Sequence, residues 1–251
     1  MSRKARIAAA FDAAAGTYDA ASDLQRRVAE SLAADIKRLT LPPHPRILEV
    51  GCGTGFLTRA LDAVLADADW TLTDLSLAML DKARDALSAP PRCHVMDGEH
   101  PDLSGPYDLI CSAMTVQWFD DPERGLERLA SLLAPGGWLA VTALADGTFR
   151  EWRKVLDDLG LAVGAHAYPT EDELRRWLGG RIRWTFADCQ SPHADAHAFL
   201  RAVKNAGAHL PVDGHAPLAP GAMRRALRAL DRDGGFTVTY RVGFALLNAG
   251  A

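Results

Sequence analysis

A glycine loop that follows a short apolar segment constrains the fold of this chain more than any other feature. The run Ile47–Val50 has the pattern of a buried strand. It is followed by Gly51, Gly53 and Gly55, with one other residue between each glycine and the next. Between a strand and a helix, such glycines permit the tight turn, the close approach of a ligand and the packing of helix on strand. The loop therefore predicts a nucleotide-type ligand at the carboxyl end of a strand.

Two residues beside the loop separate the classes of nucleotide site. A dinucleotide fold normally has a further glycine at position 56, which lets a pyrophosphate sit on the helix N-terminus, whereas this chain has Phe56. A carboxylate at Glu49 would repel a pyrophosphate but suits a cationic amino-acid group. The pair favours the methionine part of S-adenosylmethionine, and an NAD(P)-dependent oxidoreductase stays as an alternative.

Strand and helix patterns alternate after residue 45, which predicts an α/β fold with a mostly parallel sheet and helices on both faces. The expected seven strands are 46–50, 70–73, 93–96, 107–111, 138–142, 181–188 and 236–247. The expected helices are two within 5–39, broken near Gly16, and then 56–66, 76–87, 122–134, 147–159 and 170–178.

The length of 251 residues suits one domain spanning 1–251. Within it, residues 1–40 are expected to form an N-terminal helical cap and residues 45–145 the cofactor-binding core. Residues 192–235 are too long for a simple connection before the last strand, so we expect them to form a helical lid over the substrate.

Acidic residues follow the second and third expected strands. Asp74 stands where an acid accepts hydrogen bonds from ribose hydroxyls, and Asp97, with the backbone of Gly98 and Glu99, is placed to accept from an adenine amino group. The alternatives are a helix N-cap for Asp74 and a surface turn for Asp97. Carboxyl ends of neighbouring parallel strands meet at one edge, so the two ligand interpretations support each other.

Together, these segments resemble class I methyltransferases, which have a Rossmann-like fold and use S-adenosylmethionine. The resemblance covers roughly residues 45–145 and includes Ile47–Gly55, Asp74–Ser76, Asp97–Glu99, Tyr107–Ile110 and Leu133–Gly137. The residues predicted to bind the cofactor are Tyr18, Glu49, Gly51, Cys52, Gly53, Gly55, Asp74, Leu75, Met79, Asp97, Gly98, Glu99 and Ser112.

A narrower resemblance, to the malonyl-acyl-carrier-protein O-methyltransferases of biotin biosynthesis, runs across nearly the whole chain. It rests on Ala9–Asp19, Leu24–Arg27, Val116–Trp118, Ala202–Ala208 and Phe236–Tyr240. It implies methylation of the free carboxylate of a malonyl thioester, giving the methyl ester that starts pimeloyl synthesis. Two alternatives remain: a carboxyl methyltransferase of another small acid, such as a trans-aconitate-like substrate, and a non-catalytic protein that only binds the cofactor.

A carboxylate is already nucleophilic at neutral pH, so we name no general base and expect the protein to position and desolvate the acceptor. By resemblance, Tyr18 closes over the methionine end of the cofactor, and Gln117 and Trp118 border the methyl group and the acceptor. As alternatives, Tyr18 is a core aromatic and Trp118 seals the core. The cations considered for the malonyl carboxylate are Arg150, Arg201 and Lys204.

The expected partner is acyl carrier protein bearing malonyl, with malonyl-coenzyme A left open. Arg224, Arg225 and Arg228 are candidates for contact with its acidic surface. The formal net charge of -4 gives no general attraction to nucleic acid or an anionic membrane. We expect a cytoplasmic protein with four reduced cysteines and, from the histidine spacing, no metal site.

Overall fold

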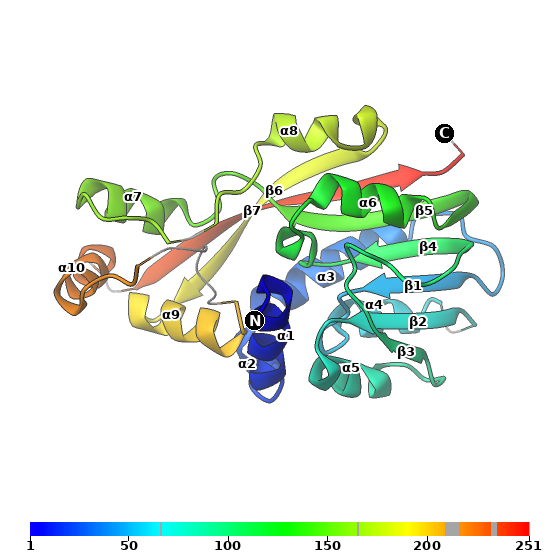
Figure 1. Cartoon of the computed structure of the whole chain (residues 1–251), viewed down its shortest axis with the longest axis horizontal. Coiled ribbons are helices and arrows are strands. Elements are labelled where there is room, and N and C mark those ends of the chain that lie inside the picture. The colour runs from blue at the N-terminus through cyan, green and yellow to red at the C-terminus, as the bar shows by residue number, and fades with distance from the viewer. Residues whose placement is uncertain (66, 165, 209–215, 232–234, 251) are drawn as a thin grey trace.

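The computed structural model describes residues 1–250 except 66, 165, 209–215 and 232–234. A seven-stranded sheet with the order β3-β2-β1-β4-β5-β7-β6 runs through the molecule (Figure 1). The strands are β1 (Arg46–Val50), β2 (Asp69–Asp74), β3 (Arg92–Val95), β4 (Tyr107–Ser112), β5 (Leu133–Leu144), β6 (Arg183–His193) and β7 (Phe236–Asn248). All neighbouring pairs are parallel except those that involve β7, which confirms the predicted α/β class.

Helices cover both faces of the sheet because successive strand residues point to opposite sides. Ile47 packs in a cluster with α3 (Asp23–Ile36), α4 (Phe56–Asp62) and α5 (Leu77–Ala83). Leu48, the next residue, packs in the opposite cluster with α6 (Pro122–Ala130) and α8 (Glu171–Arg176). The near-continuous burial of β1 follows from this double coverage.

A third apolar cluster lies where β6 and β7 project beyond the parallel part of the sheet, around α7, α9 and α10 (Figure 1). These helices are α7 (Arg150–Asp158), α9 (Ala196–Asn205) and α10 (Pro220–Leu230). The predicted lid, 192–235, therefore contains the end of β6, then α9 and α10, while its residues 209–215 and 232–234 lie outside the described part. Among the described helices, none is long and apolar enough to cross a bilayer.

Several predicted boundaries were wrong. The helix expected over 122–134 ends at Ala130, because Leu133 already pairs with Tyr107 and begins β5. Tertiary strand pairing thus overrides local helix preference here. Three helices, α1 (Arg3–Ala14), α2 (Tyr18–Ala21) and α3, replace the two expected before β1. Both α4 and α5 are shorter than predicted, and α5 is followed by the 3-10 turn η1 (Arg84–Ala86). The strand expected over 138–142 already begins at Leu133, and the one expected over 181–188 extends to His193.

Candidate active site

A cavity opens beyond the carboxyl ends of β1 and β4, where the strand order reverses direction. In open α/β sheets, ligands bind at such a switch point because the loops of the two halves diverge there. The glycine loop, Asp74, Asp97 and residues of the N-terminal helices line this cavity, which we call the cofactor cavity. Of the residues predicted to bind the cofactor, those that line it are Tyr18, Glu49, Gly51, Cys52, Gly53, Asp74, Leu75, Met79, Asp97 and Gly98.

The glycines of the loop have the left-handed conformation that the turn requires, with φ of 65° at Gly51, 54° at Gly53 and 90° at Gly55. A Cβ at Gly51 would lie 2.4 Å from Thr115, and one at Gly55 would lie 2.8 Å from Ala86. At Gly53, by contrast, only the Tyr18 ring comes within 4.0 Å. The outer glycines therefore serve packing, and the middle one leaves room for a ligand.

Asp74 holds the glycine loop in place. One of its carboxylate oxygens accepts a 2.9 Å hydrogen bond from the amide of Gly53, and the other accepts one of 2.8 Å from the amide of Ser76. Burial raises the pKa of Asp74 to about 6, against the lowering effect of these bonds. The N-cap of α5 is Ser76, whose Oγ accepts from Met79, so the N-cap alternative for Asp74 was wrong.

Glu49 is a buried carboxyl group at the methionine end expected for the cofactor. Its side chain is 2% exposed, and the hydroxyl of Thr58 donates a 2.6 Å hydrogen bond to it. Burial raises the pKa of Glu49 to about 8, although the bond from Thr58 opposes this. A cationic amino group beside Glu49 would relieve that penalty, because an opposite charge favours the ionised carboxylate.

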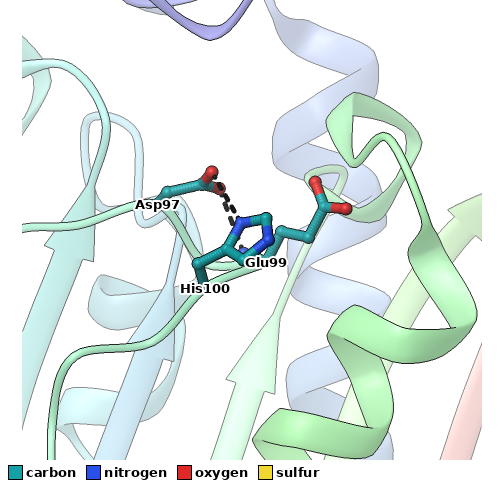
Figure 2. Close-up of side chains that lie close together, drawn as sticks. All are labelled: Asp97, Glu99 and His100. Atoms are coloured by element: carbon teal, nitrogen blue, oxygen red, sulfur yellow. Dashed lines mark hydrogen bonds and ion pairs between the residues drawn. The ribbon is translucent and has the colours of Figure 1, made fainter.

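Asp97, Glu99 and His100 come together at the other end of the cavity, with ligand-type atoms within 4.8 Å of one another (Figure 2). The ammonium group of Lys4 lies 2.7 Å from Glu99 and 3.2 Å from Asp97. Lys4 thus already balances the charge between these two carboxylates. We interpret the cluster as an ion-pair network and assign no metal to it.

Glu99, whose backbone was predicted to lie beside the cofactor, does not line the cofactor cavity, and its side chain contacts Lys4 and the start of α6. Burial would raise the pKa of its carboxyl, but Lys4 and the amides of Asp120 and Asp121 lower it to about 2. Both amide hydrogen bonds are 2.7 Å long. Glu99 therefore fixes the start of α6, and two other predicted residues, Gly55 and Ser112, likewise act through packing and backbone contacts rather than by lining the cavity.

The N-terminal helices close the cofactor cavity from above the sheet edge. Asp12 of α1 accepts a 2.5 Å hydrogen bond from the hydroxyl of Ser76, and Asp19 of α2 accepts one of 2.5 Å from Thr54 of the glycine loop. Lys4 provides the third anchor. Sequence reasoning found Tyr18 here but missed Lys4 and Asp12, because their partners are 64 or more residues away in the chain.

A second cavity adjoins the first, and we call it the acceptor chamber. The side chains that line both cavities and form their common wall are Phe11, Tyr18, Gln25, Met114 and Trp118. The chamber is otherwise aromatic and aliphatic, with its polar groups supplied by Gln25, Gln117, His166, Tyr168 and Tyr240. Such a setting excludes water from an anionic acceptor.

Gln117 has an unusual position in the chamber wall. Its amide nitrogen donates a 2.7 Å hydrogen bond to the carbonyl of Met114. Its side-chain oxygen is buried and has no hydrogen-bond partner among the described residues. A buried amide oxygen without a partner is costly, so this group is suited to a donor on a ligand.

The three cations considered for the acceptor carboxylate lie elsewhere, contrary to expectation. Arg150 is half exposed and pairs with Asp188 at 2.8 Å. Arg201 is 66% exposed, Lys204 is exposed, and none of the three lines either cavity. Arg150 lies on α7 and Arg201 and Lys204 lie on α9, and all three side chains are exposed while other residues of these helices pack in the third cluster.

Comparison with known proteins identifies the family. The family described as "Methyltransferase domain" matches residues 24–181. The malonyl-acyl-carrier protein O-methyltransferase of Magnetococcus marinus is 42% identical over 226 residues, which are 87% of this chain and 83% of that protein. The chain belongs to the family of malonyl-acyl-carrier protein O-methyltransferases. The enzyme of the same name from Geobacter sulfurreducens is 33% identical over 97% of this chain and 99% of its own length.

A longer relative is the biotin biosynthesis bifunctional protein BioCD of Bordetella avium, which is 47% identical over 240 residues. The match covers 95% of this chain, but the chain spans only about half (51%) of that protein. The expected family, methyltransferase class and fold are thereby confirmed.

Solved structures agree on the fold. The plantazolicin methyltransferase BpumL, in complex with SAH, superposes with a TM-score of 0.55 at 17% identity and covers 98% of this chain and 95% of its own. The YcgJ protein from Bacillus subtilis gives 0.60 at 13% identity over 86% and 96%. At these identities the likeness concerns the Rossmann-like architecture alone.

Proposed function

We propose that this protein transfers a methyl group from S-adenosylmethionine to the free carboxylate of malonyl-acyl carrier protein, as the first step toward a pimeloyl chain. The observation that carries the proposal is the wall shared by the two cavities. A methyl donor in the cofactor cavity and an acceptor in the chamber would meet at Tyr18, Met114 and Trp118. The names of the relatives supply the acceptor.

The side chains around the chamber position the acceptor carboxylate next to the methyl group. Bound S-adenosylmethionine supplies an electrophilic methyl group and a positive sulfonium. The aromatic wall excludes water, so the acceptor carboxylate loses hydration that would weaken its nucleophilicity. Gln117, Tyr168 and Tyr240 offer neutral polar groups around it, and the residues predicted to bind the cofactor hold the methyl carbon in line.

Neutral groups suit this reaction for an electrostatic reason. A cationic side chain paired with the acceptor carboxylate would stabilise it in the ground state, and that stabilisation is lost as the charge disappears on methylation. The absence of Arg150, Arg201 and Lys204 from the chamber wall agrees with this view.

The experiment compares acceptors. The purified protein is incubated with methyl-labelled S-adenosylmethionine and malonyl-, acetyl- or succinyl-acyl carrier protein, and with free malonate and trans-aconitate. Mass spectrometry then locates any methyl ester. We expect transfer to malonyl-acyl carrier protein alone. Transfer to a free acid in its place would support a small-acid methyltransferase, and cofactor binding without any transfer would favour a non-catalytic role.

The proposed partner is the carrier protein itself. Arg224, Arg225 and Arg228 are exposed on α10, and their contact with an acidic partner stays a prediction. A variant with all three changed to alanine should bind the carrier more weakly and with less dependence on salt. Unchanged binding would remove these arginines from the interface.

A further inference from the structure

A third cavity, larger than the chamber, lies on the side of the chamber that faces the start of α1. Its volume is about 420 Å³, which falls within the range of roughly 300 to 1,000 Å³ typical of ligand pockets. Its walls come from the beginning of α1, the segment from η2 (Val116–Trp118) to α6, residues 166–169, and η3 (Trp177–Gly180).

This cavity adjoins the acceptor chamber. Gln117, Leu144, His166 and Tyr168 line both. The chamber in turn shares its wall with the cofactor cavity. The three cavities therefore lie next to one another, and we call this series the path, with the proposed site of methyl transfer at its inner end.

The outer end of the path is marked by exposure. Ala167 is exposed, and Asp120 is 56% exposed and paired with Arg3. Buried Val116 and Phe119 form another part of its wall. The wall of this cavity is therefore polar and exposed in one part, which we call the mouth, and apolar and buried in another.

We propose that this third cavity is the channel through which the prosthetic arm of the carrier protein brings its thioester into the chamber. The inference rests on the proposed function. A free small acid would need only the chamber, whereas a thioester on a carrier needs a passage for the long, uncharged amide chain behind it. The apolar part of the wall suits that chain, and the guanidinium of Arg3 would have to exchange its ion pair with Asp120 for the phosphate that joins the arm to its carrier.

Blocking the mouth tests the route. Ala167→Trp places a bulky ring there without entering the core, because Ala167 is exposed. The matched control is Val64→Trp, at a position that is 53% exposed and lines none of the three cavities. We expect Ala167→Trp to lower kcat/KM for malonyl-acyl carrier protein at least tenfold with the dissociation constant of S-adenosylmethionine unchanged, and Val64→Trp to change neither.

A trapping experiment gives a readout that does not need turnover. The thiol of the carrier's arm is first converted to a pyridyl disulfide, which exchanges with an accessible cysteine and releases pyridylthione. Ala167→Cys should capture the arm at least ten times faster than Val64→Cys. The wild-type chain measures the background from its own cysteines, of which Cys52 and Cys111 are buried.

The outcomes separate the two proposals. Full turnover of the carrier-bound acceptor by Ala167→Trp, or equal capture rates at the two cysteine positions, would overturn the channel. If the wild-type protein leaves malonyl-acyl carrier protein unmethylated while Ala167→Cys still captures the arm selectively, the proposed acceptor fails and the channel stands.

Discussion

The cofactor cavity and the acceptor chamber are built in different ways, although they share a wall. The floor of the cofactor cavity comes from short loops that follow β1, β2, β3 and β4, and each loop bonds to its neighbour, as Asp74 does to Gly53. The chamber is assembled from residues of α1, α2, α3, η2, β5, α9 and β7, together with His166 and Tyr168. Its walls come from segments that are far apart in the chain.

This difference shows which parts of the sequence determine the cofactor cavity and which determine the acceptor chamber. A parallel sheet brings consecutive loops to one edge, so a cofactor site there requires only local motifs of a few residues. A chamber formed by distant segments requires no local motif, and its residues can vary while the cofactor floor stays constant. Substitutions in the two regions should therefore have different consequences.

The largest effect is expected in the glycine loop. Gly51→Ala forces a side chain into a left-handed backbone and against Thr115, which would lie 2.4 Å from the new Cβ. We expect loss of S-adenosylmethionine binding by more than 100-fold and a fall in the free energy of unfolding of about 2 to 5 kcal/mol. Calorimetry and denaturant unfolding measure the two quantities.

Gly136→Ala is the matched control for that substitution. Gly136 also has a positive φ, 77°, but a Cβ there would meet no atom within 4 Å. It should cost only about 1 to 2 kcal/mol and leave cofactor binding intact. Equal losses for the two variants would show that backbone strain alone, and not the close packing of the loop, governs the first result.

The shared wall should give the next largest effect. Tyr18 lies between the two cavities and packs against Phe11 and Phe56. Tyr18→Ala should lower kcat by about 10- to 100-fold, because misplacement of reacting groups by even 1 Å is that costly. Tyr18→Phe keeps the ring and should retain kcat within a few-fold. A similar loss for both variants would assign the role to the hydroxyl instead.

Glu49 should make cofactor binding depend on pH. Its pKa of about 8 in the free protein means that it is mostly protonated at pH 7. A cationic amino group would favour the ionised form, so binding should release about one proton from Glu49 and tighten as the pH rises toward 8. Titration calorimetry in buffers of different ionisation enthalpy counts the protons.

Glu49→Gln is the control and should bind the cofactor about tenfold more weakly at pH 8, with proton release reduced. The same group also affects stability: the free protein should lose stability as the pH rises from 4.5 through 8, because the unfolded carboxyl ionises first. The glutamine variant should lack this slope. Equal proton release by both proteins would place the amino group elsewhere.

The smallest effect is expected at Arg150. This side chain is 49% exposed and pairs with Asp188 outside the chamber. Arg150→Ala should change the KM of the acceptor less than twofold and the free energy of unfolding by about 1 kcal/mol or less. A rise in KM of tenfold or more would show that Arg150 takes part in acceptor binding, contrary to its position outside the chamber.

Most of the cofactor half could be predicted from the sequence because its determinants are local. The spacing of Gly51, Gly53 and Gly55 after a strand indicated both the turn and the edge of the sheet, and the acids that follow the next two strands indicated the rest of the cavity floor. Helix ends were less predictable. The end of α6 at Ala130 depends on the pairing of Leu133 with Tyr107, a contact that no local pattern encodes.

The sequence by itself indicated the fold class and the edge of the sheet where a cofactor is expected, because hydrophobic periodicity and glycine spacing act over a few residues, and its resemblance to known enzymes indicated the family. Only the tertiary structure decided which polar groups surround the acceptor. It moved Arg150, Arg201 and Lys204 out of the chamber and brought Lys4 to Glu99 across 95 positions of the chain. Such long-range contacts depend on how whole helices and strands pack against one another, and this packing produces no periodic pattern in the sequence.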